Sequence, residues 1–162
     1  NKYPAQAIHR IDYETSGLVL FCKHPFFQAY CDKNMEEHHI KKEYIALVQG
    51  HTNYKNKKII SNIARDRHNA KKMIIHPNGK ESVSIFNTLK NYKDCSLIQV
   101  TILTGRKHQI RVQCASLKHP ILNDSLYGGK KIDNTGLLLQ SHHIQFNDVD
   151  ITCPQEKRFI RK

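Results

Sequence analysis

Two stretches of the chain, residues 82–89 and 96–103, constrain its fold more than any other feature. Both alternate between apolar and polar side chains and are rich in β-branched residues. This pattern is typical of half-buried strands, because successive side chains of a strand point to opposite faces of the sheet. We therefore expect two antiparallel strands here.

Three further stretches have the composition of strands. Residues 18–22 (LVLFC) form an apolar run that is typical of a buried strand, and a polar loop leads into it. Residues 42–50 (KEYIALVQG) alternate and end at a glycine, and residues 137–146 have the composition of another strand.

Two segments are expected to be helical. Residues 25–38 begin with a proline, which a first helical turn tolerates, and continue with apolar side chains at helical spacing. Residues 108–118 place apolar side chains on one face, and Thr104 is a candidate N-cap for this helix. Together these segments predict one α+β domain, with a mixed, mostly antiparallel sheet and flanking helices.

The chain is strongly basic, since 26 Lys and Arg residues against 14 Asp and Glu residues give a net charge of +12. Residues 55–72 hold seven Lys or Arg residues against one acid, which is half of that excess. Such a charge predicts a polyanionic partner, with nucleic acid first and an anionic membrane surface second. The basic stretch is equally consistent with a solvated face that binds nothing.

Several classes of protein are excluded by what the sequence lacks. No apolar run approaches the ~20 residues of a membrane-spanning helix, and the helix expected at 25–38 is too acidic for a lipid surface. The five cysteines are widely spaced, and the histidines lack metal-site spacing. We therefore expect no metal, no disulfide framework and a cytoplasmic location with reduced thiols. The glycine motifs of nucleotide-cofactor sites are absent from the sequence.

Two polar clusters are candidates for a functional site. Asp12 lies in a polar loop, where it either acts chemically or caps a turn. Residues 104–111 (TGRKHQIR) place Arg106, Lys107 and His108 where a strand leads into a helix. Because cations are disfavoured at a helix N-terminus, we expect an anion to dock there, either a phosphate or a protein carboxylate.

Four segments together resemble the RluA-type family of RNA pseudouridine synthases. HRIDYETSG (9–17) resembles the family signature HRLDxxTSG, and KEYIALVQG (42–50) resembles KxYxAxVxG. TGRKHQIR (104–111) resembles TGRxHQIR, and HPILNDSLYG (119–128) resembles HPIxGDxxYG. The order and spacing of the segments are also those of the family, over almost the whole chain.

The chain departs from the family pattern in a few places. Ile11 replaces a leucine, and Asn123 replaces a glycine, which perturbs a turn. Family members usually open with a strand that carries a Lys-Pro element, often after an RNA-binding domain. The sequence shows neither, so residues 1–162 are expected to be a catalytic domain that lacks its N-terminal strand and any upstream RNA-binding domain.

The resemblance implies an enzyme without cofactor or metal that isomerises specific uridines of rRNA or tRNA to pseudouridine. The resemblance implies that Asp12 is the catalytic carboxylate, acting either as a nucleophile or as a base. Tyr44 would pack against the target uracil, Arg111 would ion-pair with Asp12, and Arg10 would lie beside the flipped-out base.

The alternative function is that of a non-catalytic or truncated RNA-binding module. The intact Asp12, Tyr44 and Arg111 argue against it, because a pure binder has no need for an acid that faces phosphates. In both cases RNA is the expected partner, while the target uridine and the oligomeric state are left open. We expect the following residues to bind RNA: His9, Arg10, Lys57, Lys58, Lys71, Arg106, Lys107 and His108.

Overall fold

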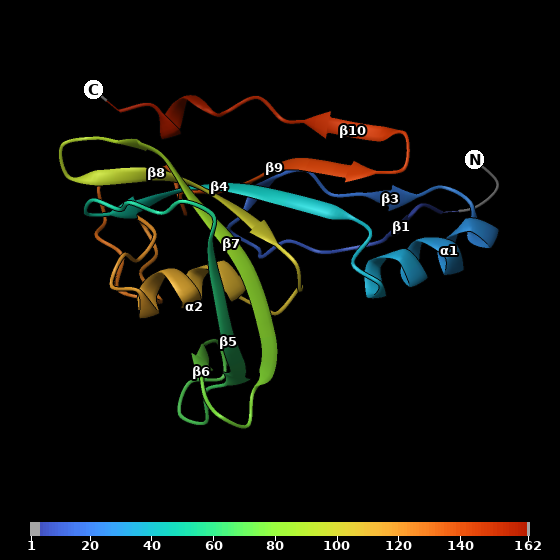
Figure 1. Cartoon of the computed structure of the whole chain (residues 1–162), viewed down its shortest axis with the longest axis horizontal. Coiled ribbons are helices and arrows are strands. Elements are labelled where there is room, and N and C mark those ends of the chain that lie inside the picture. The colour runs from blue at the N-terminus through green and yellow to red at the C-terminus, as the bar shows by residue number, and fades with distance from the viewer. Residues whose placement is uncertain (1–3, 162) are drawn as a thin grey trace.

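The computed structural model describes residues 4–161 and has the expected α+β architecture (Figure 1). The helices are α1 (Pro25–Glu36) and α2 (Gln109–Ser116), with a 3-10 turn η1 (Lys157–Phe159) near the C-terminus. The strands are β1 (Gln6–Ala7), β2 (Ser16–Gly17), β3 (Phe21–Cys22), β4 (Lys41–Gln49), β5 (Lys57–Arg65), β6 (Met73–Ile75), β7 (Lys80–Asn91), β8 (Cys95–Ile102), β9 (Leu139–Phe146) and β10 (Val149–Thr152). Within residues 4–161, no helix combines the length and apolarity needed to cross a membrane.

The main sheet is mixed and mostly antiparallel, as predicted. Its strands follow the order β10-β9-β4-β8-β7-β5-β6, and each neighbouring pair along this path is antiparallel. The short strand β2 pairs with β9 in parallel. The expected pair of strands at 82–89 and 96–103 corresponds to β7 and β8, and the stretch at 42–50 corresponds to β4.

Strand β4 lies at the centre of the sheet and of the core. It pairs with β8 on one side and β9 on the other. Five consecutive residues, 44–48, are buried, because other elements cover both faces of this strand. The core cluster around β4 includes Ile110 and Cys114 of α2 and Phe159 of η1. A strand that is covered on both faces tolerates a continuous apolar run in place of strict alternation.

Strands β5, β6 and the first half of β7 project from the body of the protein, and we call residues 57–86 the arm (Figure 1). The arm is joined to α2 by Gln113, whose Nε2 donates to the hydroxyl oxygens of Ser61 at 3.1 Å and Ser82 at 3.3 Å. Ile63 of β5 packs with Val112 of α2 in a separate small cluster. Neither β5 nor β6 was predicted from the sequence, because the basic residues of β5 mask its strand pattern and β6 has only three residues.

Two predictions of local structure are wrong. Residues 18–22 do not form one buried strand, since only Phe21–Cys22 are in a strand, β3, and residues 18–20 are half-buried. An apolar run alone does not fix an extended conformation. Thr104 is not the N-cap of α2, because His108 takes that position with a left-handed φ of 54°. The hydroxyl of Thr104 instead donates to Oε1 of Gln109 at 2.9 Å.

The helix α2 is also more deeply buried than expected. We expected apolar side chains on one face, yet residues 109–114 are all buried, polar ones included. The sheet, the arm and the loop at 121–129 enclose the helix, so its polar side chains must find partners inside the protein.

Gly17 allows the loop of residues 8–17 to lie against β9. Its φ is +103°, and a Cβ there would lie 2.1 Å from the carbonyl oxygen of Ser141. We expect Gly17→Ala to reduce the free energy of unfolding by more than about 2 kcal/mol, because the backbone strain and the clash add. The melting temperature should fall by roughly 4–8 °C. The matched control is Gly105→Ala, where a Cβ would meet no atom within 4 Å. Equal melting temperatures for the two variants would contradict this role of Gly17.

Candidate active site

The loop that carries Asp12 is fixed by its backbone. The carbonyl oxygen of Asp12 accepts the N–H of Thr15 at 2.9 Å, which closes a turn. The hydroxyl of Ser16 donates to Glu156 and accepts from Arg158 at 2.7 Å, which ties the loop to the C-terminal segment. Among residues 4–161, the carboxylate of Asp12 makes only two long ionic contacts, so it does not cap the turn.

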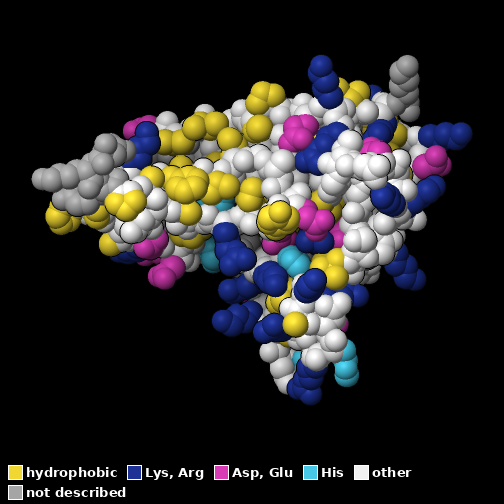
Figure 2. All heavy atoms as spheres, turned by 180° about the vertical axis from the view of Figure 1, so that it is seen from behind, with side chains coloured by type: hydrophobic (Ala, Val, Ile, Leu, Met, Phe, Trp, Pro, Cys, Tyr) yellow, Lys and Arg dark blue, Asp and Glu magenta, His cyan; other side chains and the backbone are white. Residues whose placement is uncertain are grey.

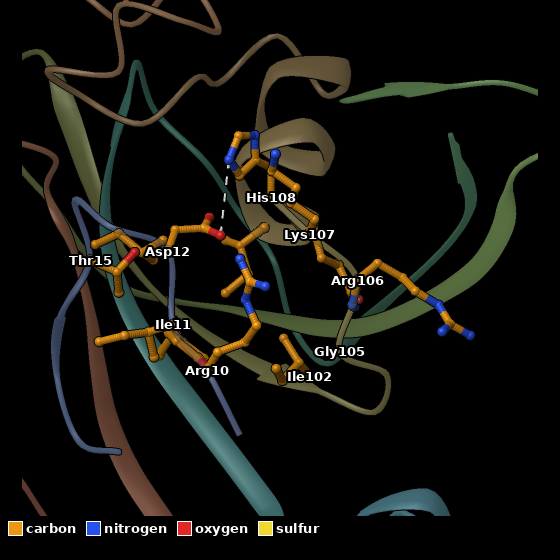
Figure 3. A pocket seen from close by; sticks show the side chains of 13 residues that line it. Arg10, Ile11, Asp12, Thr15, Ile102, Gly105, Arg106, Lys107 and His108 are labelled. Carbon is orange, nitrogen blue, oxygen red and sulfur yellow. Dashed lines mark hydrogen bonds and ion pairs between the residues drawn. The ribbon is translucent and has the colours of Figure 1, made fainter. Parts of the chain in front are cut away.

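The side chain of Asp12 faces a pocket of about 290 Å³ (Figure 3). The walls come from the Asp12 loop, β4, the end of β8 and the junction that leads into α2. Asp12 is the only acid among the lining residues, whereas Arg10, Arg106 and Lys107 are cations. The pocket is lined by Arg10, Ile11, Asp12, Thr15, Tyr44, Ile102, Gly105, Arg106, Lys107, His108, Gln109, Ile110 and Leu139.

Arg111 reaches the site from the first turn of α2, and its main partner is Asp124 rather than Asp12. Its Nε and one terminal nitrogen each donate to a carboxylate oxygen of Asp124 at 2.8 Å. The other terminal nitrogen lies 3.9 Å from Oδ2 of Asp12. The terminal nitrogen that binds Asp124 also lies 3.4 Å from Oε2 of Glu14. The expected pairing of Arg111 with Asp12 is therefore present only as a long contact, while a bidentate bond to a second carboxylate holds the guanidinium in place.

The pair formed by Arg111 and Asp124 is fully enclosed, with side-chain exposures of 4% and 0%. The backbone carbonyl of Asp124 accepts the N–H of Gly129 at 2.8 Å, and Oδ1 accepts that of Tyr127 at 3.3 Å. Burial alone would lower the pKa of the Arg111 guanidinium, but the hydrogen bonds and charge of Asp124 raise it overall. Arg111 is thus a fixed positive charge beside Asp12.

His108 lies on the other side of Asp12, with its Nε2 4.0 Å from Oδ1 of the carboxylate (Figure 3). Its Nδ1 is 2.8 Å from the hydroxyl of Tyr127, which also accepts the backbone N–H of Met73 at 2.9 Å. The Tyr127 hydroxyl has one proton, and His108 is the acceptor that it faces. The neutral imidazole therefore carries its proton on Nε2, directed at Asp12.

The neutral state of His108 has a physical cause. Burial lowers its pKa, Asp12 opposes this shift, and Arg111 and Lys107 support it. Asp12 faces His108 at 4.0 Å, which is too long for a docked anion, so the expected anion at this junction stays a prediction. His108 contributes a hydrogen-bond donor rather than a full charge.

Tyr44 forms the floor of the pocket on β4. The pairing register of β4 with β9 shifts between Glu43 and Tyr44, and the extra residue, His142, is on β9. Tyr44 is only 6% exposed. Burial raises its pKa to about 12, with Asp12 adding to the rise and Ser141 opposing it. Its phenol is therefore neutral near pH 7 and offers a ring face and a hydroxyl, not a base.

The remaining residues predicted to bind RNA divide into two groups. Arg10, Arg106, Lys107 and His108 line the pocket, although the side chain of Arg106 points away from Asp12 (Figure 3) and its Nε donates to the carbonyl of Glu81 at 2.9 Å. Lys57, Lys58 and Lys71 lie on the arm, outside the pocket lining. His9 has a structural contact, because its Nε2 accepts the backbone N–H of Leu20 at 3.1 Å.

The sequence analysis assigned no role to three residues that the structure places at or beside the site: Lys42, Asp124 and Tyr127. Asp124 and Tyr127 lie in HPILNDSLYG, the fourth segment of the family resemblance, so a signal was present. Asn123 in the same segment has a φ of 64°, and its side chain donates to Asp133 at 2.7 Å. Asparagine adopts left-handed φ readily, so the predicted perturbation of this turn is small.

No group of three or more potential metal ligands comes together within residues 4–161. The paired histidines at 38–39 and 142–143 belong to no such group.

Comparison with curated proteins identifies several relatives. The uncharacterized RNA pseudouridine synthase YhcT of Bacillus subtilis is 40% identical over 124 residues, which cover 75% of this chain and 41% of the relative. Ribosomal large subunit pseudouridine synthase C of Buchnera aphidicola is 38% identical over 135 residues, with coverages of 82% and 42%. An uncharacterized RNA pseudouridine synthase of Mycoplasma genitalium is 31% identical over 172 residues, with coverages of 100% and 56%. The chain thus spans about half the length of these relatives.

The fold is shared with two solved human structures. RNA pseudouridylate synthase domain containing 1 matches with a TM-score of 0.85 and 25% identity, over 94% of this chain and 69% of that one. RNA pseudouridylate synthase domain containing 4 matches with a TM-score of 0.79 and 18% identity, over 96% and 73%. The family model of RNA pseudouridylate synthases matches residues 1–116. The chain therefore belongs to the RluA-type family of RNA pseudouridine synthases.

Proposed function

We propose that this protein isomerises uridine in RNA to pseudouridine, with Asp12 as the catalytic carboxylate. One observation carries the proposal: a single acid, Asp12, faces a pocket whose other lining residues are cationic, uncharged polar or apolar and include Tyr44. A carboxylate with 18% side-chain exposure, placed between Arg111 and His108, is partly shielded from water and keeps an electrostatic partner on each side. Such an arrangement is suited to charge that develops on a bound sugar.

The reaction is an isomerisation without net gain or loss of atoms. The C1′–N1 bond of the uridine breaks, the uracil rotates, a C5–C1′ bond forms, and the proton on C5 is transferred to N1 through solvent or a side chain. Asp12 either attacks C1′ or accepts a ribose proton, and both roles need its ionised form. The guanidinium of Arg111, 3.9 Å away, stabilises negative charge on Asp12.

Tyr44 and Arg10 would hold the uracil outside the RNA stack. Enzymes that act on a base take it out of the stack and contact it with aromatic or apolar side chains. Tyr44 lines the pocket. Arg10 enters the same pocket from the loop (Figure 3). Because the phenol of Tyr44 stays neutral, its part is packing and hydrogen bonding rather than deprotonation of C5.

The basic arm would bind the RNA outside the pocket. Lys and Arg side chains gather where the arm joins the body and along the arm (Figure 2). Lys57 and Lys58 are neighbours on β5 and therefore point to opposite faces, while Lys71 lies beyond β5 near the tip. Lys72 contacts the ring of Tyr127 at 5.6 Å, so this end of the arm is adjacent to the site. An RNA bound at Asp12 would therefore contact only some of the Lys and Arg side chains of the arm.

The named relatives suggest the class of RNA. The relatives from Buchnera aphidicola and Vibrio cholerae are called ribosomal large subunit pseudouridine synthase C. We therefore propose ribosomal RNA as the first substrate to test and transfer RNA as the second. In RNA, specificity comes mainly from loop shape and flanking nucleotides, so the target uridine depends on contacts outside the pocket.

Asp12→Asn should abolish pseudouridine formation and leave RNA binding intact. Asparagine keeps the size of the side chain, and the turn is closed by the backbone, so the loop should be unchanged. Product formation and binding are measured on the same RNA, with deamidation of the new asparagine excluded by mass spectrometry. Turnover within about tenfold of wild type, a barrier change of only ~1.4 kcal/mol, would refute the assignment of Asp12. A binding module without activity would show no chemistry in either protein.

Arg111→Ala should abolish turnover and destabilise the protein by about 3–5 kcal/mol, because it leaves the buried carboxylate of Asp124 without a counter-charge. Chemical denaturation measures this loss. Glu14→Gln is the stability control, since Glu14 contacts the same guanidinium from a position with 51% side-chain exposure and should change stability by less than about 1 kcal/mol. A stable Arg111 variant would show that Asp124 is satisfied without it.

Binding of RNA should weaken steeply with salt, and the arm should account for part of the slope. Each phosphate contact on single-stranded RNA contributes about −0.7 to the slope of log K against log salt. Replacing Lys57, Lys58 and Lys71 with glutamine should make the slope shallower by up to about 2. The control replaces three lysines remote from the pocket lining, Lys90, Lys93 and Lys118, and removes the same charge. Equal slopes for the two triple variants would show that the arm does not contact RNA.

A further inference from the structure

Lys42 of β4 is a buried cation without a counter-charge. It is only 6% exposed. Its Nζ donates to the sulfur of Met35 at 2.9 Å, and no carboxylate of residues 4–161 lies within 4.0 Å of it. Its neighbour Lys41, in contrast, pairs with Glu43 at 3.1 Å. Burial lowers the pKa of Lys42, which reflects the cost of keeping this charge away from water.

A buried charge of this kind is expensive, so its position is informative. Charged groups inside proteins are normally paired, and an unpaired one lowers the stability of the fold. A thioether sulfur is a weak acceptor and does not neutralise an ammonium. The free protein therefore leaves Lys42 with donors that a bound anion would satisfy.

Lys42 lines a groove of about 450 Å³ that is continuous with the active-site pocket. Five residues line both cavities: Arg10, Tyr44, Ile102, Gly105 and Arg106. Lys42 pairs directly with Ile102 across the sheet and lies two residues before Tyr44. Lys42 and Tyr44 thus share one face of β4, about 7 Å apart along the strand.

The charge of the groove favours an anion. Lys42, Arg10 and Arg106 contribute three positive charges, and Glu36, exposed on α1, is the only acid that lines it. Burial, and secondarily Lys42, lowers the pKa of His9 to about 4, so His9 adds no charge near pH 7.

His9 lines the groove, and its Nδ1 is buried. Because its Nε2 accepts the N–H of Leu20, the neutral ring carries its proton on Nδ1. This buried nitrogen has no hydrogen bond of normal geometry, and its polar neighbour is the backbone of Arg10.

We propose that Lys42 binds the phosphodiester next to the flipped-out uridine. This inference rests on the proposed function. A uridine whose ribose lies at Asp12 and whose base packs on Tyr44 keeps a phosphate on each side of the ribose. The groove is the continuation of the pocket in which such a phosphate fits, with Lys42 and Arg10 as its cationic ligands. Substrate binding then supplies the counter-charge that the free protein lacks.

The first test compares Lys42→Met with Lys41→Met. Methionine retains the length and packing of the lysine stem without its charge. Lys42→Met should raise the melting temperature of the free protein by roughly 2–4 °C and weaken RNA binding about tenfold. It should also make the salt slope shallower by about 0.7. Lys41→Met removes the same charge from the same strand but from the exposed opposite face, so it should leave the slope unchanged. Lys42→Arg, which keeps the charge, should retain most of the binding.

The second test locates the phosphate. RNAs carry one uncharged methylphosphonate linkage, placed on the 5′ or the 3′ side of the target uridine, with a distant linkage as control. The wild type should lose about tenfold in affinity for one of the two adjacent positions. Lys42→Met should lose nothing further there, which is the signature of a direct contact in a double-mutant cycle. If the affinity losses caused by the uncharged linkage and by Lys42→Met multiply as independent effects, the proposal is overturned. It is also overturned if Lys42→Met binds RNA with the affinity of the wild type.

These readouts separate the inference from the proposed function. Binding is measured in the Asp12→Asn background, so it does not depend on turnover. If the wild type forms no pseudouridine yet the cycle couples Lys42 to one linkage, the catalytic assignment fails and the phosphate site stands. If pseudouridine forms and the cycle shows no coupling, the phosphate site fails alone. Should Lys42→Met not fold, the methylphosphonate series compares the wild type with Lys42→Arg, whose planar donors should change the loss at the contacted linkage only.

Discussion

The buried ion pair between Arg111 and Asp124 holds the active site together. It joins the first turn of α2 to the loop at 121–129, and both side chains are removed from water. A buried ion pair is not in itself evidence of high stability, because desolvation offsets most of the attraction. Its value here is geometric, since two parallel hydrogen bonds fix the plane of the guanidinium and leave its third nitrogen directed at Asp12. Arg111 lies 3.9 Å from Asp12, so this one charge links the Asp12 loop to α2.

A second series of contacts connects the arm to the carboxylate of Asp12. The backbone N–H of Met73 in β6 donates to the hydroxyl of Tyr127, which donates in turn to His108, whose remaining N–H faces Asp12. When Nδ1 of His108 accepts from Tyr127, the neutral ring carries its proton on Nε2. Tyr127 additionally packs under the guanidinium of Arg111 at 5.2 Å. The strand β6 of the arm is therefore two hydrogen bonds away from His108, which faces Asp12.

The parts of this structure that could be predicted are those encoded locally. The alternation at 82–89 and 96–103 identifies β7 and β8 because half-buried strands have a period of two. The identity of Asp12, Tyr44 and Arg111 as site residues followed from motifs, and the structure brings Asp12 and Tyr44 to one pocket with Arg111 behind it.

The features that could not be predicted depend on contacts between residues that are distant in the sequence. The partner of Arg111, Asp124, lies 13 residues further along the chain. It belongs to the motif HPILNDSLYG, but the motif does not show that Asp124 and Arg111 are paired. The strand β5 was not predicted because its exposed lysines interrupt the alternation, although residues 57–63 all pair with β7.

The positions of the Lys and Arg side chains explain their functions better than the net charge does. A net charge of +12 gives the molecule affinity for a polyanion. The individual cations lie in three different environments, and each environment allows a different function. Arg111 is buried and paired, so it is a fixed part of the protein's own machinery. The arm lysines are exposed and cost little to solvate, so they can contribute long-range attraction but no precise geometry. Lys42 is buried and unpaired, which is the one arrangement that lowers the stability of the free protein without a compensating internal contact. A fold that retains such a group beside its reaction pocket gives up stability in exchange for a charge already oriented toward an incoming anion.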